Sequence, residues 1–139
     1  MYNFPSNQLI NRILQDMPDV KNLNQYLVIC EHSNYLMTGY ETSDFTSHDV
    51  SILAHEKTDN FIYFSRKKLG HIQNPEYTVR SVKKTELQSI ELFVQADQNQ
   101  SVLHKIVKEK ISDFEKWKIM QNLEIKLPNK NDVALKIKI

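Results

Sequence analysis

The stretch VSILAHEKTDNFIYFSRKK, residues Val50 to Lys68, contains the clearest β-hairpin in the sequence. Val50–His55 and Phe61–Arg66 are rich in the apolar, β-branched and aromatic residues that favour strands. The polar segment KTDN between them is typical of a turn. The stretch therefore predicts two adjacent antiparallel strands, and the other apolar segments are arranged around them.

Further strands are predicted on both sides of this hairpin. Tyr26–Glu31 is apolar at successive positions, as in a central strand that is buried on both faces. NYLMTGY, residues 34–40, can pair with it across an HSN turn. Downstream, YTVRSVKKTELQSIELFVQA, residues 77–96, is long enough for one bent strand or two. Its second half alternates in hydrophobicity, with one face formed by Ile90, Leu92, Val94 and Ala96.

The C-terminal segment NLEIKLPNKNDVALKIKI, residues 122–139, predicts a second hairpin. Apolar and charged residues alternate on both sides of a polar loop, which is typical of an antiparallel pair with one face in the core and one in water. Because alternation continues to the last residue, we expect this strand to be integral to the fold. An uncovered edge strand offers unpaired backbone groups to a neighbour, so we expect a subunit contact at Lys136, Ile137, Lys138 and Ile139.

Two segments have helical periodicity. Near the N-terminus, Leu9, Ile10, Ile13, Leu14 and Met17 fall on one helical face. Ser6 or Asn7 can cap this short helix, and Pro18 ends it. The second helix lies within residues 97–121, with an apolar stripe formed by Leu103, Ile106, Val107, Ile111, Phe114 and Trp117.

The order of these elements predicts an α+β fold in a single domain, residues 1–139. We expect a mainly antiparallel sheet of about six to eight strands that ends in the C-terminal β-hairpin. The short N-terminal helix and the long C-terminal helix are expected to pack on one face of this sheet, because an apolar sheet face must be covered.

Composition excludes several classes of protein. The formal net charge is +1, so the chain as a whole has no electrostatic bias toward nucleic acid or an anionic membrane. Cys30 is the sole cysteine, which fits a reducing compartment, and no apolar run reaches the roughly 18 residues of a membrane span. The N-terminus lacks the basic start and apolar core of a signal peptide. We expect a cytoplasmic protein, or a virion-associated one if it derives from a phage.

Catalytic motifs are scarce. With two glycines, the sequence has no glycine-rich phosphate-binding loop, and it contains no G-x-S-x-G motif. Cys30 and His32 would share one face of a strand, and His48 and His55 lie among acidic residues. These four residues define one alternative, a small metal-dependent or thiol hydrolase. Their spacing matches no ligand or triad signature, so we expect no catalytic site, no metal and no cofactor.

Basic residues gather in two short segments, at Arg66, Lys67 and Lys68 and at Arg80, Lys83 and Lys84. Aromatic residues lie among them in the sequence, namely Tyr63, Phe64, Tyr77 and Phe93. A sheet face that combines lysines with aromatic rings can hold single-stranded nucleic acid. A second alternative is therefore a nucleic-acid-binding module, although the low net charge favours a solvated lysine face.

The remaining function is a non-enzymatic protein-interaction or assembly domain, which we take as the leading hypothesis. The order helix, strands, helix, strand is loosely similar to that of small ring-forming tail-terminator and neck proteins of tailed phages. This resemblance covers the coarse element order alone, and it implies assembly through subunit contacts. An inhibitor-type protein of a mobile element would have the same sequence features. Its expected partner is another protein or a second copy of the chain.

Overall fold

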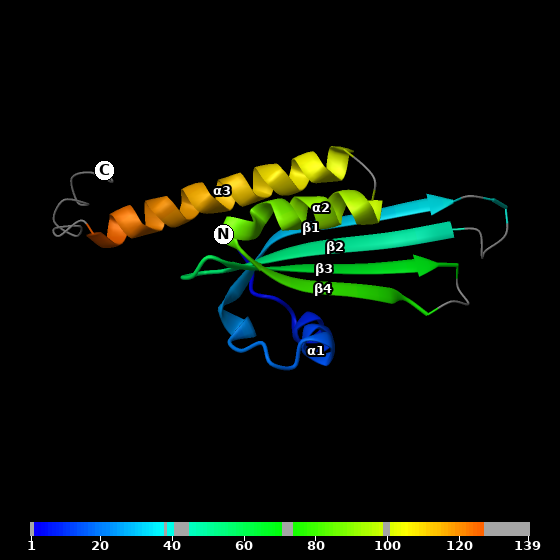
Figure 1. Ribbon diagram of the computed structural model, residues 1–139, viewed down its shortest axis with the longest axis horizontal. Helices are drawn as coiled ribbons and strands as arrows, with labels where there is room; N and C mark the ends of the chain where they lie inside the picture. The colour runs from blue at the N-terminus through cyan, green and yellow to red at the C-terminus, as the bar shows by residue number, and fades with distance from the viewer. Residues whose placement is uncertain (1, 38, 41–44, 71–73, 99–100, 127–139) are drawn as a thin grey trace.

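The computed structural model describes residues 2–37, 39–40, 45–70, 74–98 and 101–126. Short 3-10 helices precede the first strand and follow the last one. The main elements are α1 (Asn7–Asp16), β1 (Tyr26–Met37), β2 (Phe45–His55), β3 (Asn60–Leu69), β4 (Glu76–Lys83), α2 (Leu87–Gln98) and α3 (Ser101–Lys126). In Figure 1 the helices labelled α2 and α3 lie on one side of the sheet, and the helix labelled α1 lies on the other.

The four strands form an antiparallel meander in the order β1-β2-β3-β4. The hairpin predicted from Val50–Lys68 is present as β2 and β3, with Ala54 opposite Phe61 next to the turn. We call this turn end of the sheet proximal. The opposite end, where Met37 pairs with Phe45, is called distal.

The prediction of six to eight strands is wrong, because the described residues form a four-stranded sheet. Part of the excess came from splitting β1 in two. The chain passes through the predicted HSN turn as continuous strand from Tyr26 to Met37. Turn-forming residues such as Ser33 and Asn34 are tolerated there because each has a partner on β2.

The other excess strands lie in α2, where residues Leu87–Gln98 form a helix and not a strand. Ile90 and Val94 are fully buried four residues apart, whereas Leu92 is 55% exposed. Ile90, Leu92, Val94 and Ala96 would share one face in a strand, but in a helix only the i, i+4 pair shares the core side. The short apolar run fits both periods, and tertiary packing selects the helical one.

The predicted C-terminal hairpin is wrong in its first strand, because α3 continues as helix to Lys126. Leu123 follows Ile119 at helical spacing, and both side chains are exposed on α3. The rest of that hairpin lies outside the described residues. It includes the predicted subunit contact at Lys136, Ile137, Lys138 and Ile139.

Helices cover both faces of the sheet, so the prediction of one covered face is also wrong (Figure 1). One apolar cluster joins α2 and α3 to the upper face, with Phe61, Tyr63, Ile90, Val107 and Phe114 among its fully or nearly fully buried members. The other cluster joins α1 to the lower face, through Ile13, Leu53, Ile62 and Phe64. Side chains of successive strand residues point to opposite faces, which explains why β2 and β3 supply both clusters.

A test of this arrangement replaces Phe114 with alanine. Phe114 is fully buried between α3 and the sheet, so Phe114→Ala should lower the free energy of unfolding by about 3–5 kcal/mol. Ile119→Ala is the matched control, because Ile119 is 58% exposed on the same helix and its truncation should cost less than about 0.5 kcal/mol. Urea denaturation measures both values. Equal losses in the two variants would contradict the packing of α3.

Candidate functional site

The distal end of the sheet is where apolar side chains meet solvent. There β1, β2 and β3 run beyond the end of α2 (Figure 1). Tyr35 and Leu36 are each 59% exposed, Met37 is 51% exposed and Leu69 is 49% exposed. We call these four residues the distal tip. Leu36 and Leu69 share a face because each pairs with Thr46 on the central strand β2.

The lower face of the distal tip is ordered by aromatic contacts. The ring of Tyr35 stacks on that of Phe45, with 5.1 Å between centroids. The Tyr35 hydroxyl donates a hydrogen bond to the Met37 sulfur at 3.2 Å. Phe45 is buried, whereas Tyr35 and Met37 remain exposed. The distal tip therefore presents apolar side chains that are exposed to solvent but fixed in place by contacts with their neighbours. Surfaces of this kind are suited to binding.

A cavity of about 350 Å³ opens on the upper face beside the distal tip. It lies between the end of α2 and the uncovered part of the sheet, lined by Asn34, Leu36, Thr46, His48, Lys67, Leu69 and Asp97. This volume is near the lower limit of small-molecule sites. The cavity mixes two apolar residues of the tip with polar groups of both charge signs.

Two hydrogen-bonded pairs lie next to this cavity. Nε2 of His48 lies 3.3 Å from Oγ of Ser65, and both side chains are buried. The hydroxyl of Tyr63 donates a hydrogen bond to Oδ2 of Asp97, which joins β3 to the last turn of α2. Burial and this hydrogen bond to Asp97 both raise the pKa of Tyr63. Burial, followed by the nearby Lys67 ammonium, lowers the pKa of His48, so the imidazole is neutral at pH 7.

The burial and hydrogen bonding of these groups fit a structural role better than nucleophilic catalysis. A serine nucleophile must reach substrate, but Ser65 is almost fully buried beneath α2 and α3. Asp97 is bonded to Tyr63 and so is engaged in anchoring α2. The Tyr63–Asp97 bond therefore fixes the end of α2 on the sheet, and the His48–Ser65 pair links β2 to β3.

The four residues of the predicted hydrolase site are brought together only in part. His32 and His48 lie on the same upper face, one register step apart on β1 and β2. Cys30 is buried farther along β1 in the core, whereas His55 lies on the lower face at the proximal end. No group of three or more metal-binding side chains of the kind His, Cys, Asp or Glu occurs among the residues that the structure describes.

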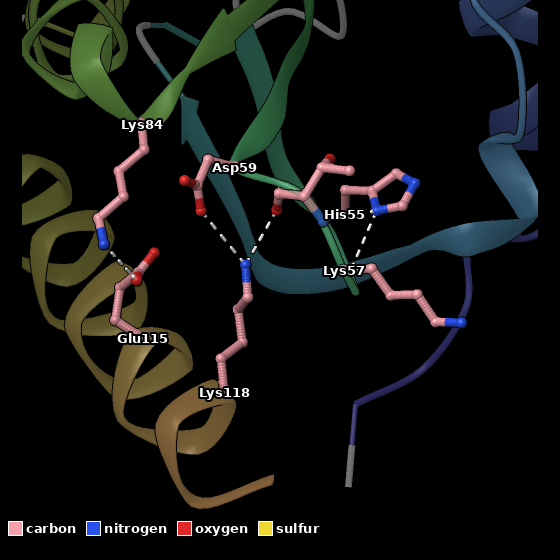
Figure 2. Close-up of polar contacts among 7 residues, drawn as sticks. His55, Lys57, Asp59, Lys84, Glu115 and Lys118 are labelled. Carbon is pink, nitrogen blue, oxygen red and sulfur yellow. Dashed lines mark hydrogen bonds and ion pairs between the residues drawn. The ribbon is translucent and has the colours of Figure 1, made fainter. Parts of the chain in front are cut away.

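His55 has a defined role at the β2–β3 turn (Figure 2). Its Nδ1 accepts hydrogen bonds from the backbone N–H groups of Lys57 at 3.0 Å and Thr58 at 3.1 Å. Nε2 therefore carries the proton, which it donates to Oε1 of Gln25 at 3.0 Å. Burial lowers the pKa of His55, because it disfavours the charged imidazolium, and the nearby Lys118 and Lys57 ammonium groups act in the same direction.

The proximal turn is also held by α3 (Figure 2). Nζ of Lys118 donates to the backbone oxygen of Thr58 at 2.9 Å and lies 3.6 Å from Asp59. Lys84 pairs with Glu115 of α3 at 3.0 Å. A pocket of about 330 Å³ lies beside this clamp. Its charged groups already contact the turn or α3, so the proximal end is a structural joint.

The predicted basic surface is split between different parts of the fold. Arg66 and Lys68 point to the lower face of the sheet, whereas Lys67 and Arg80 point to the upper face. Lys83 ends β4, and Lys84 is paired with Glu115. Arg66 is 3.6 Å from Asp49 on the neighbouring strand. These six residues do not form one continuous basic face in the described structure.

A groove of about 640 Å³ runs between α1 and the lower face of the sheet. The Arg12 guanidinium stacks 3.7 Å from the Tyr77 ring centroid and is also bonded to Gln15 and Asp16. Arg66 is paired with Asp49 at the same groove. Because each guanidinium already has an acidic neighbour, the groove offers little net charge for an anionic ligand.

Comparisons with known proteins yield no match to a family model, to a curated protein or to a solved structure. Among the described residues, no helix combines the length and hydrophobicity needed to cross a membrane. Function therefore has to be argued from the surface and contacts of this chain.

Sequence analysis missed the distal tip and the network beside it. The sequence assigned Leu36 and Met37 to a strand, but it did not indicate that these side chains are exposed to solvent. Asp97 was placed at the start of the second predicted helix, but it lies in the last turn of α2 and accepts a hydrogen bond from Tyr63. The sequence carried little signal for the distal tip, because the pairing of residues 34–37 with residues 45–48 is visible only in the sheet register.

Cys30 provides a test of the thiol alternative. The side chain is buried, and burial raises the pKa of its thiol to about 11. Since the thiolate is the reactive form, we expect alkylation of the folded protein by iodoacetamide at neutral pH to be far slower than alkylation of the same chain in denaturant. Mass spectrometry measures both rates. Comparable rates, with the fold intact, would support a reactive thiol.

The two buried histidines predict a loss of stability in acid. The folded pKa values of His48 and His55 lie below the value of about 6.5 that applies in the unfolded chain. The unfolded state therefore binds protons first as pH falls, so their stabilisation is complete above about pH 6.5 and is lost progressively below it.

Urea titrations at a series of pH values measure this loss as a slope of unfolding free energy against pH. We expect His55→Gln to reduce the slope, because glutamine does not titrate. Lys57→Arg should retain it, because it keeps both the backbone N–H that binds His55 and the positive charge that helps to lower its pKa. An identical slope in His55→Gln and the natural sequence would remove His55 from the explanation.

Proposed function

We propose that this protein is a non-enzymatic protein-interaction domain that binds its partner through the distal end of the sheet. The observation that carries the proposal is the exposure of Tyr35, Leu36 and Met37 at the end of β1, together with Leu69 of β3, which lies across β2 from Leu36. Scattered surface apolar residues need no explanation, but a contiguous group at one end of a sheet marks a binding surface.

The energetics of the distal tip support binding. Covering a large apolar side chain contributes about 1.5–3 kcal/mol. Several such side chains in one patch can therefore offset part of the free-energy cost of association. Tyr35 is already stacked on Phe45, which lowers the conformational entropy that binding would remove. Aromatic residues of this kind are enriched among the residues that dominate interface energies.

The hydrogen bonds made by the polar side chains support a non-enzymatic role. In the described part of the chain, the Tyr63–Asp97 and His48–Ser65 pairs join elements of the fold to one another. His55 is engaged by the backbone of the proximal turn. A catalytic group must reach substrate in a cleft, whereas these groups stabilise junctions.

The nucleic-acid alternative receives less support from the geometry. Its basic residues lie on two faces of the sheet, and Arg66 and Lys84 have acidic partners. Binding along a backbone requires a continuous positive track. The split basic residues therefore favour a protein partner over nucleic acid.

Photo-crosslinking in the cells that naturally make this protein tests the proposal. A benzophenone amino acid placed at Tyr35 or Leu69 should form adducts with another polypeptide chain, because both positions lie in the proposed contact. Leu92 on α2 is the matched control, since it is 55% exposed but distant from the tip, and it should give little product. The adducts are identified by mass spectrometry.

Two results would overturn the proposal. One is the absence of protein adducts from Tyr35 and Leu69 under conditions where the probe reacts. The other is an equal yield from Leu92, which would indicate random encounters. Adducts with nucleic acid in place of protein would favour the alternative module.

A further inference from the structure

We propose that the partner at the distal tip is a second copy of this chain, and that the free edges of the two β1 strands pair antiparallel. This inference rests on the proposed function and names its partner. It follows from three independent features, which are the open edge of β1, the residues along that edge and the flank of α3 above it.

The edge of β1 is closed at one end and open at the other. Asn3 forms a bridge with Val28, and its carbonyl oxygen accepts from the Val28 N–H at 2.7 Å. The N-terminal segment therefore occupies the proximal part of the edge. From Glu31 to Met37, β1 pairs with β2 on one side, and no described segment pairs with the other side. Unpaired backbone groups along these residues offer a template for another strand.

The side chains along this edge lack the usual protection against pairing. Edge strands are normally guarded by charges, especially lysine, or by proline. The opposite edge, β4, is guarded in this way by Glu76, Arg80 and Lys83, and Pro75 precedes it. The stretch EHSNYLM of β1 contains one acidic residue, Glu31, and no lysine, arginine or proline. Of the two edges, β1 is therefore the one that permits pairing.

Two-fold symmetry then limits the register. Two copies related by an axis perpendicular to the sheet bring their β1 strands together antiparallel, and side chains that face each other must share a face. A pairing centred on Asn34 places Leu36 beside His32 of the second copy, and Tyr35 beside its Ser33. Glu31 then lies opposite Met37 of the second copy. No like charges meet, so the sequence is compatible with itself.

The flank of α3 extends the same surface. α3 packs over β1, and its His104 and Glu115 contact Glu91 of α2 and Lys84, which marks the side away from the β1 edge. On the other side, the ring of Tyr2 lies 5.3 Å from Trp117. At roughly 100° per residue, Val102 and Ile106 lie on the same side as Trp117.

The positions of Val102 and Ile106 along α3 can also be compared with the position of Asn34 along β1. Lys110 lies close enough to Cys30 to affect its pKa. Val102 is eight residues earlier, about 12 Å along the helix, and Asn34 is four residues beyond Cys30, about 13 Å along the strand. In the proposed dimer Val102 is therefore placed near the level of Asn34, and its side chain is 62% exposed.

The strand edge and the helix flank are both required. A stable interface buries at least about 1,200 Å² in total, which a seven-residue edge does not reach without adjoining side chains. Leu36, Tyr35 and Met37 on the strand, together with Val102 and Ile106 on α3, supply apolar area on both faces of the paired edge. The proposed contact therefore covers most of the distal tip.

Sedimentation equilibrium of the purified full chain over a wide concentration range tests the proposal. We expect a reversible equilibrium between the 16.4-kDa chain and its dimer. Leu36→Lys should raise the dissociation constant about tenfold or more, because it places a cation on each paired edge. Leu92→Lys is the matched control and should leave the constant unchanged, since Leu92 is similarly exposed on α2. Circular dichroism checks that both variants are folded.

Disulfide trapping locates the contact independently. In a pairing centred near Asn34, residues opposite each other have Cα atoms about 4.5–5.5 Å apart, within the range that a disulfide spans. Among Ser33→Cys, Asn34→Cys and Tyr35→Cys, at least one should form a covalent dimer rapidly on oxidation. Leu92→Cys should not.

A chain that stays monomeric at high concentration would overturn the proposal, and so would a dimer unaffected by Leu36→Lys with no trapping in the strand. The proposed function is tested separately, by the crosslinking of Tyr35 in cells. A monomeric chain whose Tyr35 still crosslinks to a different protein in cells would refute self-pairing and keep the interaction domain. Absence of both self-association and crosslinks would refute both.

Discussion

The rest of the structure depends on the burial of the central strand pair, β2 and β3, on both of their faces. Ile52 and Tyr63 face one side and Leu53 and Ile62 face the other, and all four are fully buried. Each such burial contributes about 1.5–3 kcal/mol, so neither face can be left in water. α1 must therefore cover one face, while α2 and α3 cover the other (Figure 1).

The lengths of the elements explain why this coverage stops short of the distal end. The 11 residues of β2 extend about 36 Å, whereas the 12 residues of α2 extend only about 18 Å. α3 is longer but continues past the proximal turn, where Lys118 binds Thr58 (Figures 1 and 2). Because α3 extends past the proximal turn and α2 is short, the helices leave the distal tip uncovered. The Tyr63–Asp97 bond marks the point where helical cover ends.

Sequence patterns predicted the elements whose period is unambiguous. β2, β3, α1 and most of α3 were recognised because each has a long apolar pattern or clear end signals, such as the Ser6 cap that accepts from Leu9 at 3.2 Å. α2 was missed because IELFVQA satisfies a strand period and a helix period equally well over so few residues. The candidate site was largely invisible, because exposure of Leu36 depends on where α2 ends in space. His32 and His48 lie on one face of the sheet, whereas the position of His55 on the opposite face could be known only from the sheet register.

A bulge in β1 determines what the distal tip presents. The register with β2 shifts between Val28 and Cys30, so Ile29 is an extra residue and both Ile29 and Cys30 face the α2–α3 core. A bulge reverses the side on which each later residue lies. Leu36 consequently shares the upper face with the α3 flank, while Tyr35 lies below and stacks on Phe45. If the same residues alternated regularly, with no bulge, Leu36 would lie beneath the sheet and Tyr35 above it, and Leu36 would not share a face with the α3 flank. The buried bulge thus links the packing of the core to the surface offered for binding.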